Sequence, residues 1–255
     1  MRPSDDDVHR LYYWPSIPGR GEFVRLALEE SGMRYVDVAR LPASEGGGAD
    51  AITRVLGGEL GGLRPFAPPV LVRGELVIAQ TAAILDHLAA SSERDGHHPL
   101  APSDPGARLE ALQTQLTIAD LVAETHDVHH PIGASLYYAD QRDEAARRAL
   151  LFRRERAAKF LNYFEDLAQH GGGEHLVAGA FTYVDLSIAH VLDGLAYAFP
   201  GAFTARWSPT IPTLLALRDR VHARPRIAAY LASSRRIAMN EHGIFRHYPE
   251  LDDPA

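Results

Sequence analysis

Apolar and polar residues follow different periodicities in the two parts of the chain. In residues 1–90, short apolar runs alternate with segments in which apolar residues recur every three or four positions, an order typical of an α/β domain. Strands are expected at residues 8–14, 33–38, 68–72 and 75–79, and helices at residues 20–31, 52–56 and 80–91. The pattern therefore predicts the order β-α-β-α-β-β-α, which begins with a βαβ unit.

Turn-forming residues support these boundaries. Gly32 directly follows the first expected helix, where glycine commonly ends a helix in the left-handed conformation. Arg73 and Gly74 lie between the last two expected strands, which favours a hairpin. Residues 91–105 are rich in Ser, Pro, Gly and charged residues, and we therefore expect them to form a linker after the α/β domain.

From residue 106 to 255 the periodicity is helical. Amphipathic segments cover residues 107–130, 142–170, 181–199, 212–222 and 225–234. The third segment opens with a capping signature, because the Thr182 side chain can accept the amide of Asp185 while the Asp185 carboxylate reaches back. This part is therefore predicted to be an all-α domain.

The composition narrows the possible functions. The chain has 255 residues, is 46% hydrophobic and carries a net charge of -7, which argues against non-specific binding to nucleic acid or anionic membranes. It contains no cysteine, so disulfides and a cysteine nucleophile are excluded, and thiol chemistry would need a thiol from outside the chain. No apolar run reaches the ~18 residues of a membrane span, and the polar start MRPSDDDVHR does not resemble a secretory signal. We expect a soluble, cytoplasmic protein.

Four segments resemble the cytosolic glutathione transferases, and they occur in the family's order and spacing. They are LYYW…GRGEFVRLALEESG from residue 11, PPVLVRGELVIAQTAAILDHLA from residue 68, TIADL from residue 117 and HLVAGAFTYVDLSIAHV from residue 175. The resemblance is strongest to the tyrosine-type classes. It implies a thioredoxin-like, glutathione-binding domain at residues 1–90 and a helical domain at residues 106–255 that lines the second-substrate pocket.

The resemblance assigns thiol activation to the turn after the first strand. A free thiol has a pKa of about 8.5, and a hydroxyl that donates to sulfur favours the thiolate. By resemblance this donor is Tyr13, whereas Tyr12 points to the opposite face of the strand and is expected to pack. The turn is one residue longer than in the tyrosine classes, so Ser16 is a rival donor. Arg20 resembles an arginine that assists the thiolate, and Arg25 is expected to form an internal salt bridge.

Further residues resemble the family's glutathione-binding positions. Pro69 resembles a cis-proline that, with Val70, exposes a strand edge to the cysteinyl backbone of glutathione. The preceding residue, Pro68, departs from the family because it has no N–H to offer. Gln80 and Thr81 begin a helix, whose N-terminal amides suit a carboxylate, and the resemblance places the γ-glutamyl carboxylate there.

Asp120 is conspicuous because it follows Leu109, Leu112 and Leu116 along an apolar helical stripe, where a carboxylate needs a partner. In the family, such an aspartate reaches across a homodimer interface to the γ-glutamyl amine of the partner subunit's glutathione. A structural salt bridge is the alternative interpretation.

Three histidines follow on the same segment. His126 and His130 are four residues apart, with His129 beside them, a spacing that can bind zinc but is also common on solvated helix ends. By resemblance, His126 and His130 line the second-substrate pocket, where they could act as general acid or base. Phe245 in the C-terminal tail is expected either to cover this pocket or to pack on the helical domain.

These observations predict a detoxification-type transferase that activates glutathione, its co-substrate, for attack on an electrophilic small molecule. Alternatives are a glutathione-dependent isomerase or lyase, favoured by Pro68 and the histidines, and a noncatalytic binding protein of the same fold. A zinc enzyme is a more remote possibility, and we expect no metal. The sequence does not identify the electrophile.

Overall fold

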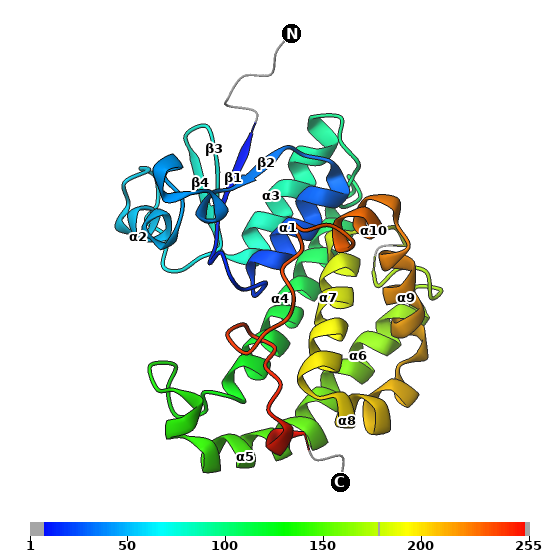
Figure 1. The fold of residues 1–255 in the computed structure, drawn as a ribbon. Coiled ribbons are helices and arrows are strands. Elements are labelled where there is room, and N and C mark those ends of the chain that lie inside the picture. Colours follow the sequence, from blue (N-terminus) through cyan, green and yellow to red (C-terminus); the bar gives the residue numbers. More distant parts are fainter. Residues whose placement is uncertain (1–7, 178, 253–255) are drawn as a thin grey trace. The chain divides into compact units, whose positions relative to one another are not determined.

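The computed structural model describes residues 8–177 and 179–252, and the chain forms two compact units (Figure 1). The first unit runs to Ser103 and also contains Pro225–Ala238, while the second consists of Asp104–Arg224 and the residues from Met239 onward. The first unit thus includes Pro225–Ala238, which the sequence pattern assigns to the helical domain at residues 106–255. The polar N-terminal stretch considered above lies mostly outside the described residues.

The first unit is built on a four-stranded sheet with the strand order β2-β1-β3-β4. Its strands are β1 (His9–Tyr12), β2 (Tyr35–Asp37), β3 (Val70–Arg73) and β4 (Leu76–Ala79). β1 pairs with β2 in parallel and with β3 antiparallel, and β3 and β4 form an antiparallel hairpin. The predicted strands and the predicted βαβ unit and hairpin are therefore confirmed. β1, β2 and β4 are shorter than expected, and β3 begins two residues later and ends one residue later than expected.

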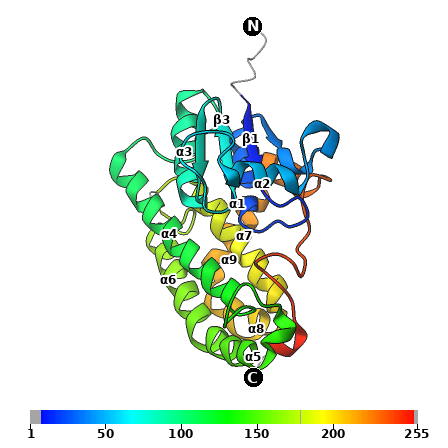
Figure 2. The same ribbon diagram turned by 90° about the vertical axis from the view of Figure 1, so that its left-hand side faces the viewer.

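Helices α1 (Gly21–Ser31) and α3 (Thr81–Arg94) pack against each other and lie side by side in both views (Figure 1, Figure 2). Gly32 ends α1 at a φ of 75°, as the sequence predicts. The short helix α2 (Ala49–Gly57) packs against a buried cluster that includes Tyr12, Val70 and Val72. The packing role expected for Tyr12 is thereby confirmed.

The late segment of the first unit contains helix α10 (Pro225–Leu231), which packs against α1. The Tyr230 hydroxyl donates to the Glu22 carboxylate at 2.8 Å, and both side chains are fully buried. Local periodicity predicts this helix, but it does not show that its partners lie two hundred residues earlier.

The second unit is helical, as predicted. Its helices are α4 (Pro105–Asp127), α5 (Arg142–Leu151), α6 (Ala157–His170), α7 (Tyr183–Ala198), α8 (Pro200–Ala202) and α9 (Pro212–His222). A π-type turn over Phe152–Arg156 joins α5 to α6, so the expected segment 142–170 is one helical run with a wider turn inside it. α7 packs against both α4 and α9.

The predicted capping box at the start of α7 is present. The Thr182 hydroxyl accepts the Val184 amide at 3.2 Å, and the Asp185 carboxylate accepts the Thr182 amide at 2.7 Å. Asp185 also accepts the Leu176 amide at 2.8 Å, which ties the incoming loop to the helix. These bonds satisfy amides that the first turn of a helix otherwise leaves unpaired.

The described C-terminal residues pack on the second unit. The Phe245 ring is buried against Gly194 of α7, where a Cβ atom would lie 2.4 Å from the ring. The Asp252 carboxylate accepts the amides of Gly201 and Ala202 at 2.6 and 3.0 Å and so caps α8. Among the described residues no single helix is long and apolar enough to cross a membrane, and α7 meets that criterion only when combined with Pro200–Thr210, to which it is bent by 112°.

Candidate functional site

Tyr13 directly follows β1, and the turn behind it closes over its ring. The Arg20 amide donates to the Tyr13 hydroxyl oxygen at 2.8 Å. Cβ atoms built on Gly19 and Gly21 would lie 2.1 and 2.5 Å from atoms of this ring, so both positions require glycine. The glycines were not singled out from the sequence, although their place on either side of Arg20 was a usable signal.

This setting keeps Tyr13 protonated but polarised. Burial raises the pKa of Tyr13, while the Arg20 amide and the charges of Arg20 and Arg25 oppose the shift. Because its oxygen already accepts one N–H bond, the phenol proton can be donated elsewhere. No acceptor for that proton is found in residues 8–177 and 179–252. The geometry suits a hydroxyl that donates to an external anion.

The rival donor Ser16 lies in the same turn and is exposed to solvent. Arg20, the residue just before α1, is half-buried, and its amide donates to Tyr13. Arg25 forms the internal ion pairs expected from the sequence, with Asp37 at 2.7 Å and Glu22 at 3.3 Å. In this structure the residue before α1 is therefore hydrogen-bonded to Tyr13, one of the two proposed donors.

The register of the sheet brings the expected glutathione-binding residues to one edge. Val70 pairs with Tyr12 on one side and with Ala79 on the other. The residues just beyond this row are Tyr13, Pro69 and Gln80, and since neighbouring strands are about 5 Å apart they span roughly 10 Å. The Pro68–Pro69 peptide bond is cis, as expected, and Pro68 contributes a carbonyl but no N–H to this edge.

Gln80 and Thr81 show two anomalies at this edge. Among the described residues, Gln80 is the non-glycine residue with a positive φ, 72°, a conformation that costs about 1–3 kcal/mol. The Thr81 hydroxyl is buried and has no hydrogen-bond partner within the described chain. No side chain caps the start of α3. Amides and a hydroxyl without partners at a helix N-terminus can bind a carboxylate.

Asp120 lies on the exposed side of α4. The stripe of leucines that precedes it on the helix lies on the same side. Leu109 and Leu116 are 66% and 52% exposed. The side of α4 that packs in the second unit instead carries Ala111, Thr114, Gln115, Ile118, Leu121, Val122 and Thr125. No internal salt bridge of Asp120 occurs among the described residues, so the structural alternative is not supported.

The three histidines at the C-terminal end of α4 and just beyond it do not form one cluster. The rings of His126 and His130 lie 5.0 Å apart, and their Nδ1 atoms face the Asp127 carboxylate and the Leu136 carbonyl. His129 is fully buried, with its ring 5.4 Å from that of Tyr248, and burial lowers its pKa to about 3. In the part of the chain that the structure describes, no group of three or more His, Asp or Glu side chains is placed to hold a metal ion.

Of the two alternatives for Phe245, the packed arrangement is the one observed. Its side chain is 1% exposed and its ring stands edge-on to His190 at 5.7 Å, inside the second unit. A role as a mobile cover over a pocket is therefore not supported by this structure, because the ring fills the space left by Gly194.

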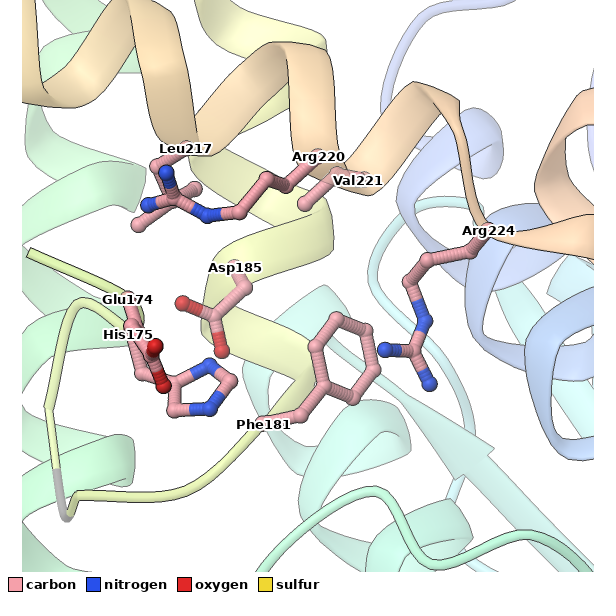
Figure 3. A pocket seen from close by; sticks show the side chains of 8 residues that line it. All are labelled: Glu174, His175, Phe181, Asp185, Leu217, Arg220, Val221 and Arg224. Atoms are coloured by element: carbon pink, nitrogen blue, oxygen red, sulfur yellow. The ribbon is translucent and has the colours of Figure 1, made fainter.

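A cavity of about 230 Å³ opens near the start of α7 (Figure 3). It is lined by Glu174, His175, Phe181, Asp185, Leu217, Arg220, Val221 and Arg224. Three of its charged groups are engaged by the fold: Asp185 accepts two amides, Arg220 donates to the Gly173 carbonyl, and Arg224 stacks over the Phe181 ring at 3.6 Å. We therefore interpret this cavity as part of the α7 cap.

Comparisons with known proteins agree with this architecture. Residues 126–234 match the family model described as glutathione S-transferase, C-terminal domain. A comparison with curated proteins finds none that is similar in sequence.

Several solved structures share the fold. Prostaglandin synthase D of Nilaparvata lugens is 18% identical with a TM-score of 0.67, covering 89% of this chain and 98% of its own. The Pi-class glutathione S-transferase of Onchocerca volvulus is 20% identical with a TM-score of 0.64, covering 88% and 91%. A monomeric glutathione S-transferase of the hookworm Necator americanus is 18% identical with a TM-score of 0.60, covering 88% and 95%. At such identities the likeness shows the fold.

Proposed function

Because the chain has the glutathione S-transferase fold and carries that family's C-terminal domain in residues 126–234, we propose that it is a glutathione transferase. It would hold glutathione as the thiolate for attack on an electrophilic small molecule. The observation that carries the proposal is the arrangement at one sheet edge, where Tyr13, cis-Pro69 and the start of α3 meet.

Tyr13 is the proposed thiolate partner. Its protonated hydroxyl, polarised by the Arg20 amide, would donate to the glutathione sulfur and so lower the thiol pKa. Arg20 would add a positive charge near the developing thiolate. Ser16, exposed in the same turn, is the alternative donor.

The tripeptide backbone would pair with the strand edge at Pro69 and Val70, and the γ-glutamyl carboxylate would accept the amides of Gln80 and Thr81 with the Thr81 hydroxyl. The missing N–H of Pro68 removes one hydrogen bond from this arrangement. The unpaired Thr81 hydroxyl supports the carboxylate site because a buried donor without a partner is unfavourable on its own.

The helical unit would supply the remaining roles. We assign Asp120 to the γ-glutamyl amine of a partner subunit's glutathione, in a homodimer whose interface uses the exposed face of α4. His126 and His130, with Nδ1 atoms facing oxygen acceptors, would present their Nε2 atoms to a polar second substrate. The buried Phe245 would support this region rather than contact substrate.

Calorimetric titration with glutathione, together with thiolate absorbance near 240 nm over a range of pH, tests the proposal. We expect binding with a lowered thiol pKa. Tyr13→Phe should raise the thiol pKa and reduce turnover by about 100-fold, while glutathione affinity changes little. Tyr12→Phe is the matched control, since Tyr12 packs in the core beside α2. Absence of binding at millimolar glutathione would contradict the proposal and leave either a different low-molecular-weight thiol or a noncatalytic role.

A second candidate retains glutathione as a cofactor in an isomerase or lyase. Pro68 and the histidine pair favour it, since both depart from an apolar, general-purpose transferase site. One of the similar structures is named a prostaglandin synthase. Product analysis separates the two activities, because a thioether conjugate indicates a transferase and unchanged glutathione indicates an isomerase.

A further inference from the structure

The late segment Pro225–Ala238 reaches a buried carboxylate in α1. Glu22 is fully buried, and its Oε1 accepts the Tyr230 hydroxyl at 2.8 Å. The Arg236 guanidinium lies 2.6 Å from the same oxygen. Tyr230 and Arg236, about two hundred residues later in the sequence, thus contact the same carboxylate oxygen of Glu22.

The other side of Glu22 faces Arg25. Glu22 Oε2 lies 3.3 Å from Arg25 Nη1, and Arg25 Nε donates to Asp37 at the end of β2 at 2.7 Å. The Arg25 side chain is fully buried, and its Nη2 has no partner among the described residues. Removing one member of such a network leaves another charge buried without a partner, which is strongly destabilising. The positions of these side chains are therefore tightly constrained.

Arg25 in turn holds the turn over Tyr13. Its Nη1 donates to the Pro18 carbonyl at 3.3 Å, and the same carbonyl accepts the Glu22 amide at 3.0 Å. Pro18 is followed by Gly19, where a Cβ atom would lie 2.1 Å from the Tyr13 hydroxyl oxygen, and by Arg20, whose amide donates to that oxygen. The Arg25 guanidinium also lies 5.8 Å from the centre of the Tyr13 ring.

We propose that Tyr230 and Arg236 are positioning residues for Tyr13, acting through Glu22 and Arg25 on the turn at Pro18–Arg20. They do not touch the proposed thiol. Tyr230 and Arg236 hold the Glu22 carboxylate in place, and that carboxylate orients Arg25. Arg25 holds the turn, so that the Arg20 amide stays hydrogen-bonded to Tyr13. This inference rests on the proposed role of Tyr13 in thiol activation.

The test compares Tyr230→Phe and Arg236→Gln with wild type in the full-length protein. Tyr230→Phe keeps the buried ring and removes only the hydroxyl that binds Glu22. Each variant is expected to raise the pKa of bound glutathione by about 0.5 unit, measured at 240 nm, which is about threefold less thiolate at a pH below the pKa. The KM for glutathione should change less than kcat. Arg236→Lys should restore part of the effect.

Arg235→Gln is the matched control. It removes the same charge from the neighbouring position, but Arg235 pairs with Glu29 instead of Glu22. Its thiol pKa should equal that of wild type. Circular dichroism and thermal melts show whether each variant folds. If Arg236→Gln fails to fold, the comparison of Tyr230→Phe with wild type decides.

The outcomes separate the two proposals. If wild type lowers the thiol pKa and Tyr230→Phe and Arg236→Gln behave like Arg235→Gln, the positioning role is wrong and the proposed function stands. If wild type binds glutathione without lowering the thiol pKa, the proposed function itself is wrong, and the positioning role is wrong with it.

Discussion

At the scale of single residues, the start of α3 contains two locally unfavourable features. Gln80 adopts a φ of 72° that a glycine would adopt without strain, and the Thr81 hydroxyl is buried without a hydrogen bond in the described chain. Strained conformations of this kind cluster at active sites and ligand-binding positions. Both features follow from tertiary contacts, so the sequence indicated the residues but not their conformation.

Replacing Thr81 by valine separates binding from stability. The substitution removes a hydroxyl without a partner and keeps the shape, so the free energy of unfolding should stay the same or rise by up to about 1 kcal/mol. Glutathione affinity should fall about tenfold, because a hydrogen bond to a carboxylate contributes roughly 1.5 kcal/mol or more. Calorimetry and urea denaturation measure the two quantities. Thr81→Ser, which keeps the hydroxyl, should bind like wild type, and unchanged affinity in Thr81→Val would contradict the carboxylate site.

At the scale of elements, caps and turns were predictable because their chemistry is local. The αL glycine after α1, the hairpin turn between Arg73 and Leu76 and the capping box of α7 all depend on residues within a few positions of each other. The orientation of α4 was not predictable from its leucines. Thr114 and Thr125 satisfy their hydroxyls on carbonyls four residues earlier and can therefore be buried.

The capping box gives a stability prediction for α7. Thr182→Ala should lower the free energy of unfolding by about 1–2 kcal/mol, because the Val184 amide loses its buried acceptor. Thr117→Ala on α4 is the matched control, since the Thr117 hydroxyl bonds an exposed helix carbonyl and its loss should change stability by less than about 0.5 kcal/mol. Equal losses in the two variants, measured by urea denaturation, would show that the cap contributes nothing specific.

At the scale of the whole molecule, the return of Pro225–Ala238 to the first unit and the exposed face of α4 are both beyond local sequence patterns. The first depends on contacts between residues far apart in the chain. The second, in the proposed homodimer, would depend on contacts with another copy. The exposed leucines are consistent with the proposed homodimer. One structure of the same fold, from a hookworm, is described as monomeric.

The oligomeric state can be tested at Leu116, which is 52% exposed on α4. If this face joins two subunits, Leu116→Glu should convert a dimer into a monomer in light scattering at micromolar concentration, because a charge would be buried without a partner. Leu150→Glu, at a position on α5 that is 38% exposed, should leave the mass unchanged. A wild-type monomer, or a dimer insensitive to Leu116→Glu, would refute this interface.

Each unit also contains a buried histidine with a lowered pKa, which makes the molecule sensitive to acid. Burial, together with the charge of Arg73, lowers the pKa of His9 in the first unit to about 4, and burial with the charge of Arg246 lowers that of His129 in the second to about 3. Both values lie below the unfolded value of about 6.5. As the pH falls below 6.5, the unfolded chain therefore binds protons that the folded chain does not.

Stability should accordingly be constant above about pH 7 and decrease as the pH falls from 6.5 towards 4. Each histidine should remove about 2 kcal/mol by pH 5, because a tenfold change in proton concentration corresponds to about 1.4 kcal/mol. Urea denaturation at pH 7.5 and pH 5 measures the difference. His129→Leu should reduce the difference by about half, whereas His170→Leu, at an exposed helix end, should leave it unchanged. Equal stability of wild type at the two pH values would mean that the buried histidines gain protons without unfolding, through local opening of the packing around them.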